Sequence, residues 1–138
     1  MPIEINKRVF ILIAIIIGVV GLVISLVAQY YHPLSEDTVL EMKIKVIDKP
    51  NLIALYQSNV SIIIVDCSES GAYYKAGYRL PSAVWFSVPS AFYNTNKSVV
   101  VYSNDDNVSR VYCVDLLKHI KSDVYLFKGG YAVWNKEG

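Results

Sequence analysis

The sequence predicts an α/β fold in which a parallel sheet is flanked by helices and preceded by one transmembrane helix. An apolar run near the N-terminus predicts the membrane helix. β-branched runs then alternate with segments of helical spacing, and this alternation predicts parallel strands joined by helices. The central runs carry almost no charge, as expected for strands buried on both faces.

The membrane helix is predicted at residues 9–30. The stretch Val9–Ala28 holds no charge and one polar side chain, Ser25. At about 1.5 Å per residue it extends about 30 Å, the thickness of the hydrocarbon layer. It is longer than the apolar core of a signal peptide, roughly 7–15 residues. Cleavage after Ala28 would also put Leu26 where a small residue is needed, so an uncleaved anchor fits better than a signal peptide.

The charges around this helix predict its orientation. Lys7 and Arg8 precede it, whereas Glu36 and Asp37 follow it. The positive-inside rule therefore predicts a single-pass protein of the cell membrane with residues 1–8 in the cytoplasm. Residues 31–39 are then an outer linker, and residues 40–138 form an extracytoplasmic domain. Three glycosylation sequons agree with outside placement, although they can equally be unmodified; they begin at Asn59, Asn96 and Asn107.

Small residues form a stripe inside the predicted membrane helix. They follow one another at spacings of 4, 3, 4 and 3, so they share one helix face: Ala14, Gly18, Gly21, Ser25 and Ala28. Small side chains let a second helix approach closely, and such packing is a main source of helix association in lipid. The stripe predicts contact with other transmembrane subunits or with a second copy, and the surrounding bilayer is the remaining partner.

The segments after the linker alternate in a regular order. Strands are expected within 42–48, 60–67, 83–86, 98–102 and 123–127, and helices within 49–59 and 109–120. The chain's formal net charge is +1, which gives no basic surface for nucleic acid. Its two cysteines exclude a zinc ribbon and a disulfide scaffold. We expect no metal and no cofactor.

Three pieces of residues 40–138 resemble a rhodanese-like domain. The first is "IIIVDC" followed by "AGYRLPSAVWF", similar to a strand ending in Asp and a Gly-His-x-Pro-Gly-Ala segment. The second, "VVVYSNDDNVSRVYCVDLL", resembles the strand, active-site loop and helix of the family. The third, "VYLFKGGYAVW", resembles the closing strand and its Gly-Gly-x-x-x-Trp signature. The resemblance implies the family's parallel sheet flanked by helices.

The same resemblance implies that the loop has lost its chemistry. Active members carry a persulfide on a cysteine at the position of Ser103 and an arginine at that of Val108. Related dual-specificity phosphatases need that cysteine and an arginine at the position of Ser109. Two aspartates add negative charge where an anion would bind. We therefore expect no catalytic residue in the degenerate loop, which comprises Ser103, Asn104, Asp105, Asp106, Asn107, Val108 and Ser109.

Other candidates for chemistry are few. Cys67 and Cys113 can be buried free thiols, a disulfide in an oxidising compartment, or sulfur carriers. The only histidines, His32 and His119, are expected to lie away from Ser103. The acidic loop lacks an EF-hand pattern, so a solvated turn or a helix cap is its expected role.

The sequence thus predicts a non-catalytic, membrane-anchored, rhodanese-like accessory or docking subunit of a membrane protein complex. A respiratory or redox complex is the partner suggested by anchoring and by the family's sulfur chemistry. The eleven tyrosines exceed what a small core buries, and tyrosine is favoured at interfaces. Two alternatives remain open: a sulfurtransferase or sulfur carrier that uses Cys67 or Cys113, and a module that binds a small ligand, cationic by the charge of the loop.

Overall fold

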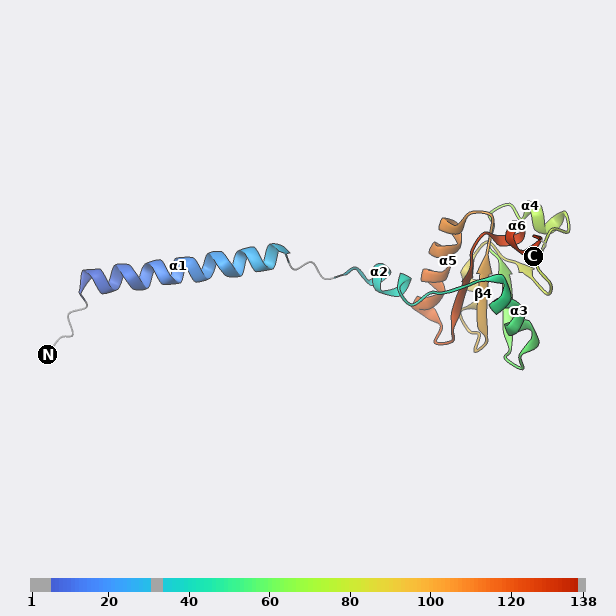
Figure 1. Cartoon of the computed structure of the whole chain (residues 1–138), viewed down its shortest axis with the longest axis horizontal. Coiled ribbons are helices and arrows are strands. Elements are labelled where there is room, and N and C mark those ends of the chain that lie inside the picture. Colours follow the sequence, from blue (N-terminus) through green and yellow to red (C-terminus); the bar gives the residue numbers. More distant parts are fainter. Residues whose placement is uncertain (1–5, 31–33, 137–138) are drawn as a thin grey trace. The chain divides into compact units, whose positions relative to one another are not determined.

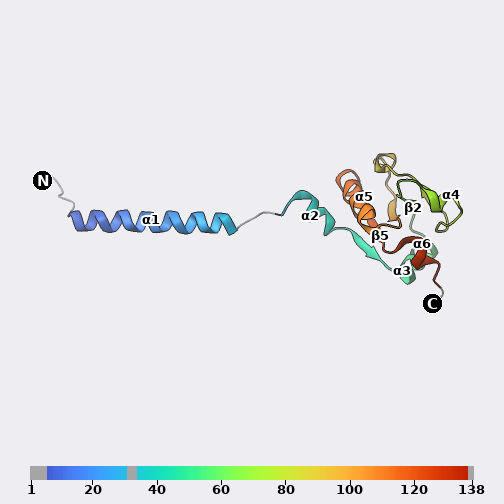
Figure 2. The same cartoon turned by 90° about the horizontal axis from the view of Figure 1, so that it is seen from above.

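The computed structural model describes residues 6–30 and 34–136, which form two compact units. The first contains one helix, α1 (Lys7–Tyr30), of 24 residues. The second begins at Ser35 and contains a five-stranded sheet with helices around it (Figures 1 and 2). The strands are β1 (Lys45–Ile47), β2 (Ile62–Asp66), β3 (Val84–Trp85), β4 (Ser98–Tyr102) and β5 (Val124–Phe127). The helices of this unit are α2 (Glu36–Glu41), α3 (Lys49–Gln57), α4 (Ala72–Lys75), the 3₁₀ helix η1 (Pro89–Phe92), α5 (Asp106–His119) and α6 (Gly130–Trp134).

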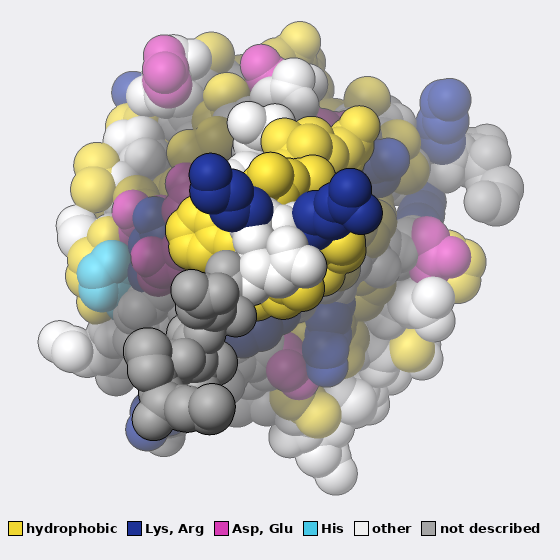
Figure 3. Space-filling view, turned by 90° about the vertical axis from the view of Figure 1, so that its left-hand side faces the viewer, with side chains coloured by type: hydrophobic (Ala, Val, Ile, Leu, Met, Phe, Trp, Pro, Cys, Tyr) yellow, Lys and Arg dark blue, Asp and Glu magenta, His cyan; other side chains and the backbone are white. Residues whose placement is uncertain are grey.

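Helix α1 is apolar along its whole described length. Every one of its side chains is exposed, and none of its residues packs into a core. It is long and apolar enough to cross a membrane. Figure 3, which looks onto its N-terminal end, shows basic side chains in dark blue beside the apolar side chains in yellow. The five residues of the small-residue stripe all lie on this helix, and a Cβ added to Gly18 or Gly21 would meet no atom within 4 Å.

The sheet is parallel throughout, as predicted, in the order β1-β5-β4-β2-β3. Parallel strands need crossover connections, which the helices supply on both faces of the sheet. In Figures 1 and 2, α5 lies on one side of the strands, and α3 and α6 lie on the other. Strand β4 stands in the middle of the sheet and contributes to both cores.

Side chains of β4 alternate between the two cores, which explains its unbroken apolar run. Val99 and Val101 pack with α5, whereas Val100 and Tyr102 pack on the opposite face with α3 and α6. All four are buried. A strand buried on both faces has no polar positions, because each alternate side chain meets a different apolar layer.

Side-chain caps begin the principal helices of this unit. Asp48 accepts a hydrogen bond from the Asn51 amide at 3.0 Å and starts α3, with a proline in its first turn. Asp105 accepts from the Asn107 amide at 2.9 Å and starts α5. An N-terminal cap satisfies an amide that has no partner inside the helix. The segments predicted as helices at 49–59 and 109–120 correspond to α3 and α5, although α5 begins earlier than predicted.

Four short helices were not predicted, and one of them changes the linker. Helix α2 occupies residues 36–39 of the linker expected at 31–39, while residues 31–33 of that linker lie outside the described residues. Ser35 caps it by accepting from the Thr38 amide, and Lys118 of α5 binds Asp37 at 2.8 Å. The folded unit therefore starts at Ser35 rather than at residue 40. The other unpredicted helices are α4, η1 and α6.

Candidate functional site

The loop between β4 and α5 lies at the carboxyl end of the central strand, where sheets of this kind bind ligands. Ser103 follows β4 directly and is 2% exposed. Its hydroxyl donates to the backbone oxygen of Asp105 at 2.7 Å and accepts from the Asp105 amide at 3.2 Å. The first residue of the loop is therefore folded back onto the loop itself.

A second serine, Ser109 in the first turns of α5, hydrogen-bonds with Ser103. Ser109 is fully buried, and its Oγ lies 2.7 Å from the Oγ of Ser103. The thiol of Cys67 lies 3.6 Å from the same Ser109 oxygen. These contacts fit one chain of donors, which runs from the Cys67 thiol through Ser109 and Ser103 to the Asp105 carbonyl. The chain ends on a backbone carbonyl, which is not a base that could activate Ser103.

The two aspartates of the loop have separate roles. Asp105 caps α5, so its carboxylate lies where an anion would approach the first amides of that helix. Asp106 instead accepts from the Gly129 amide at 3.0 Å and connects the loop to the turn after β5. Asp105 lines the hollow above the loop and Asp106 does not, while the expectation that their charge opposes an anion stays a prediction.

Two glycines let the turn after β5 reach the loop. Gly129 and Gly130 have φ values of +80° and +56°, in the left-handed region that favours glycine. A Cβ on Gly130 would lie 2.4 Å from the backbone oxygen of Ser103. Only a residue without a side chain permits this approach. The Gly-Gly turn therefore packs directly against the backbone of the Ser103 loop. The sequence pattern did not predict this contact.

A shallow hollow of about 260 Å³ opens above the loop. Two carboxylates and no basic side chain line it, so an anion finds no positive partner there. Its lining consists of Ser68, Glu69, Ser70, Ser103, Asn104, Asp105 and Val108. The hydroxyl oxygen of Ser68 is buried and is without a hydrogen-bond partner among the described residues.

Cys67 lies beside this hollow, at the end of β2. It is 1% exposed and lines a second hollow of about 370 Å³ together with Tyr112, Val108 and Val111 of α5. Burial raises the pKa of the Cys67 thiol, although hydrogen bonds with Ser109 and Ser103 act to lower it. A thiol with a raised pKa is largely protonated at neutral pH and is a poor nucleophile.

Cys113 is buried more deeply, in the core between α5 and the sheet. It is 0% exposed, and its sulfur lies 3.9 Å from the backbone oxygen of Tyr125. Burial raises the pKa of its thiol strongly, and the neighbouring Cys67 raises it further. Both cysteines are free in the structure and belong to the same core cluster. The pairing alternatives for these cysteines remain predictions.

The histidines, the metal-binding side chains and the sequons complete the predicted groups. His119 sits in the last turn of α5, stacks on Tyr93 with ring centroids 3.7 Å apart, and contacts Asp115 at 3.6 Å. His32 lies outside the described residues. Within residues 6–30 and 34–136, no group of three or more metal-binding side chains comes together. The sequon residues Asn59, Asn96 and Asn107 are all exposed.

Comparisons with known proteins give the fold alone. No family model matches the sequence, and no curated protein matches it. Among solved structures, the chain is similar to a protein of unknown function from Rhodopseudomonas palustris CGA009, described as a possible tyrosine phosphatase. The TM-score is 0.58 at 15% sequence identity, over 75% of this chain and 94% of the other. The α/β architecture of the folded unit is therefore one found in a solved protein.

Proposed function

We propose that this chain is a membrane-anchored, rhodanese-like docking subunit whose β4–α5 loop does no catalysis. The observation that carries the proposal is the hydrogen bond between Ser103 and Ser109 at 2.7 Å. In the resembled phosphatases these two positions hold the nucleophilic cysteine and the arginine that binds the anion. Here two hydroxyls occupy both positions and satisfy each other.

The rhodanese-like assignment draws on where the resembling pieces lie in the fold. Each piece includes the carboxyl end of one strand, and these three strands, β5, β4 and β2, are consecutive in the sheet. The Gly129–Gly130 turn contacts the loop of Ser103, as expected if the signature serves that loop. The distant solved neighbour, described as a possible tyrosine phosphatase, agrees with the same ancestry of strand, loop and helix.

The chemistry of the loop supports the absence of both activities. Sulfur transfer needs a thiolate that a persulfide can form on, and a serine hydroxyl ionises far above the pH at which a thiol does. Phosphoryl transfer needs a nucleophile and a positive group for the phosphate oxygens. The hollow above the loop offers two carboxylates instead. Cys67 supports neither route, because it is buried and its pKa is raised.

Labelling with sulfur donors tests this half of the proposal. We expect the purified full chain, incubated with thiosulfate or a persulfide donor, to carry no sulfane sulfur by intact-mass measurement. A phosphotyrosine substrate should likewise remain unhydrolysed. Stoichiometric persulfide on Cys67 or Cys113 would show instead that the chain is a sulfur carrier, and phosphate release that depends on Ser103 would establish an enzyme.

The anchoring half of the proposal rests on α1. A helix of 24 residues with no buried side chain has no protein core to explain its apolar surface. At about 1.5 Å per residue it is long enough to cross the hydrocarbon layer. Lys7 and Arg8 begin the helix, and the first acidic residues after it are Glu36 and Asp37. This asymmetry supports a cytoplasmic N-terminus and an extracytoplasmic folded unit in the cell membrane.

The docking partner is proposed to pack on the small-residue stripe of α1. Ala14, Gly18, Gly21, Ser25 and Ala28 leave room for the backbone of another transmembrane subunit or of a second copy. Solubilisation in mild detergent, followed by size measurement and mass spectrometry, should recover the chain in a complex. A chain that runs alone as a monomer would disprove the docking role.

A matched pair of substitutions tests the stripe itself. Gly18→Leu should release the partner, because the side chain fills the space that a neighbouring backbone needs. Val19→Leu places the same leucine side chain on a different face of the helix and should leave the complex intact. Loss of the complex with both variants, or with neither, would remove the stripe as the contact.

A further inference from the structure

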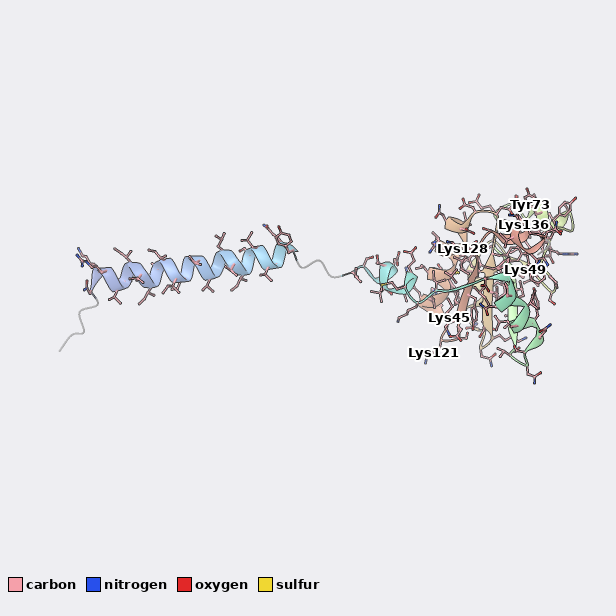
Figure 4. All side chains as sticks on the ribbon, in the orientation of Figure 1. Lys45, Lys49, Tyr73, Lys121, Lys128 and Lys136 are labelled. Carbon is pink, nitrogen blue, oxygen red and sulfur yellow. The ribbon has the colours of Figure 1, made fainter. Side chains whose placement is uncertain are left out.

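A row of lysines follows the edge of the sheet that β1 forms. Figure 4 labels them on the folded unit. The row, here called the basic edge, consists of Lys45, Lys49, Lys121, Lys128 and Lys136. Lys49 is half-buried, and the other four side chains are exposed. No part of the proposed docking mechanism uses these residues.

The sheet topology brings these residues together. Strand β1 is the outermost strand, and its neighbour is β5, with Lys45 opposite Tyr125. Lys121 precedes β5 and Lys128 follows it directly, so the two lysines lie at opposite ends of that strand. At about 3.3 Å per residue the row is roughly 20 Å long. It is therefore a linear surface rather than a pocket.

The positive charge of this edge is largely uncompensated. Asp123 pairs with Lys45 at 3.2 Å, and Asp48 is occupied as the cap of α3. Among residues 34–136, Lys121 and Lys128 form no ion pair. The whole chain has a formal net charge of only +1, so this concentration of charge is local. Five lysines face Asp48, Asp123 and Asp106, the last of which contacts Gly129 beside Lys128, and this excess makes the edge attractive to a polyanion.

Lys49 is held in place at one end of the row. Its ammonium donates to the backbone oxygens of Trp134 at 2.6 Å and Lys136 at 2.8 Å. The same ammonium lies 5.4 Å from the centroid of the Trp134 ring. Trp134 can therefore serve as a fluorescent reporter of the surroundings of Lys49. The other tryptophan, Trp85, belongs to β3 at the opposite edge of the sheet.

We propose that the basic edge binds the phosphate groups of anionic lipids at the surface of the bilayer that α1 crosses. This inference rests on the proposed membrane anchoring. Only residues 31–34 separate α1 from Ser35 in the sequence, a reach of less than about 20 Å even when extended. The chain therefore tethers Ser35, the first residue of the folded unit, within that distance of the end of α1, and a cluster of basic side chains tethered to a bilayer attracts anionic headgroups.

The two tryptophans provide the measurement, because α1 contains neither. The full chain is reconstituted into bilayer discs that carry a headgroup-linked spin label, which quenches nearby tryptophans. The variants Trp85→Phe and Trp134→Phe each leave one reporter, either Trp134, which lies against Lys49, or Trp85 of β3, the edge strand farthest from β1. With phosphatidylglycerol in the discs, Trp134 should be quenched about threefold more than Trp85. In phosphatidylcholine discs, or in about 0.5 M NaCl, the two should be quenched equally.

Lys121 and Lys128 form no ion pair within residues 34–136, so their substitution tests whether their positive charge is what binds the lipid. Lys121→Gln with Lys128→Gln should abolish the excess quenching of Trp134, whereas Lys121→Arg with Lys128→Arg should preserve it. Equal quenching of both tryptophans in anionic discs would overturn the proposal and favour a soluble acidic partner for the edge. Excess quenching that resists both salt and the glutamine variant would also overturn it. A chain that fails to enter the discs would instead disprove the anchoring on which the inference rests.

Discussion

The segments that follow two neighbouring strands, β4 and β2, differ in how their buried serine hydroxyls are hydrogen-bonded. At the end of β4, the Ser103 hydroxyl contacts Ser109 and both the carbonyl and the amide of Asp105. At the end of β2, the Ser68 hydroxyl oxygen is buried without a partner among the described residues. The comparison teaches that neighbouring strand ends in one sheet can satisfy a buried hydroxyl completely or leave it without a partner. Its hydrogen bonds hold Ser103 in the loop.

The approach of Gly130 to the loop gives the largest expected effect. Gly130→Ala would place a Cβ 2.4 Å from the Ser103 oxygen at a φ of +56°. Backbone strain and overlap together should lower the free energy of unfolding by about 3 kcal/mol or more. Urea unfolding of the full chain in detergent, followed by tryptophan fluorescence, measures this.

Gly77→Ala is the matched control for that substitution. Gly77 also has a positive φ, of +91°, but a Cβ there meets nothing within 4 Å. It should lose only the strain, about 1–2 kcal/mol. If both variants lose the same amount, the turn after β5 does not support the β4–α5 loop, and the closed state of that loop needs another cause.

Removing the central hydroxyl of the donor chain should have the next largest effect. Ser109→Ala leaves the Cys67 thiol and one side of Ser103 without their partner in a buried site. We expect a loss of about 2 kcal/mol in the free energy of unfolding. Ser90→Ala, at an exposed serine of η1, should change it by less than about 0.5 kcal/mol. Equal effects of the two would mean that the serine pair adds nothing to stability.

The buried thiols predict a loss of stability at alkaline pH. Burial raises the pKa of Cys67 and Cys113 above their ordinary value of 9.0, so above that pH the unfolded chain releases protons that the folded chain retains. Stability contributed by the neutral thiols is intact below pH 9 and declines as pH rises. Between about pH 9 and 10 the free energy of unfolding should fall by up to about 1.4 kcal/mol for each thiol.

Cys113→Val isolates one of these contributions. The variant should show about half the decline of the wild type over that interval, because only Cys67 still titrates. Burial raises the pKa of Tyr56 to about 12, and tyrosines contribute only above their ordinary value of 10.0. A free energy of unfolding that stays constant up to pH 10 would show that the thiols reach water in the folded chain.

The smallest expected effect is at the end of β2. Ser68→Ala removes a buried hydroxyl oxygen that has no partner among the described residues, so its loss should leave stability unchanged or raise it by about 0.5 kcal/mol. The same substitution at Ser109 is expected to destabilise, which makes the pair a direct test of the comparison. Destabilisation at Ser68 by more than about 1 kcal/mol would mean that its hydroxyl has a partner after all.

The fold could be read from the sequence where the signal was long. The runs that became β2 and β4 are β-branched and uncharged, and the spacing in α5 is helical, because each element buries a defined surface. Helices α4 and α6 escaped prediction because each is a short turn that follows a glycine in the left-handed region. Helix α2 was missed because its polar side chains resembled a linker, although Ser35 gives a cap signal.

The candidate site was predictable in position but not in its contacts. The strand, loop and helix around Ser103 followed from local pattern alone. The bond to Ser109 arises because the first turns of α5 fold back over the loop, and the contact of Asp106 with Gly129 joins segments far apart in the chain. Such contacts depend on how the whole sheet is ordered, which a local pattern does not specify.

The order of the strands has a consequence for how the chain acquires its fold during synthesis. Strand β5 is the last to be made, yet it lies between β1 and β4 and is the neighbour with which β1 pairs. Strand β1 can therefore join the sheet only after β5 has been synthesised. The edge that β1 forms cannot exist on a nascent chain that stops short of Phe127. Long-range parallel pairing of this kind is slow, because the intervening chain must be closed into a loop first. The complete five-stranded sheet should thus form only after translation of β5.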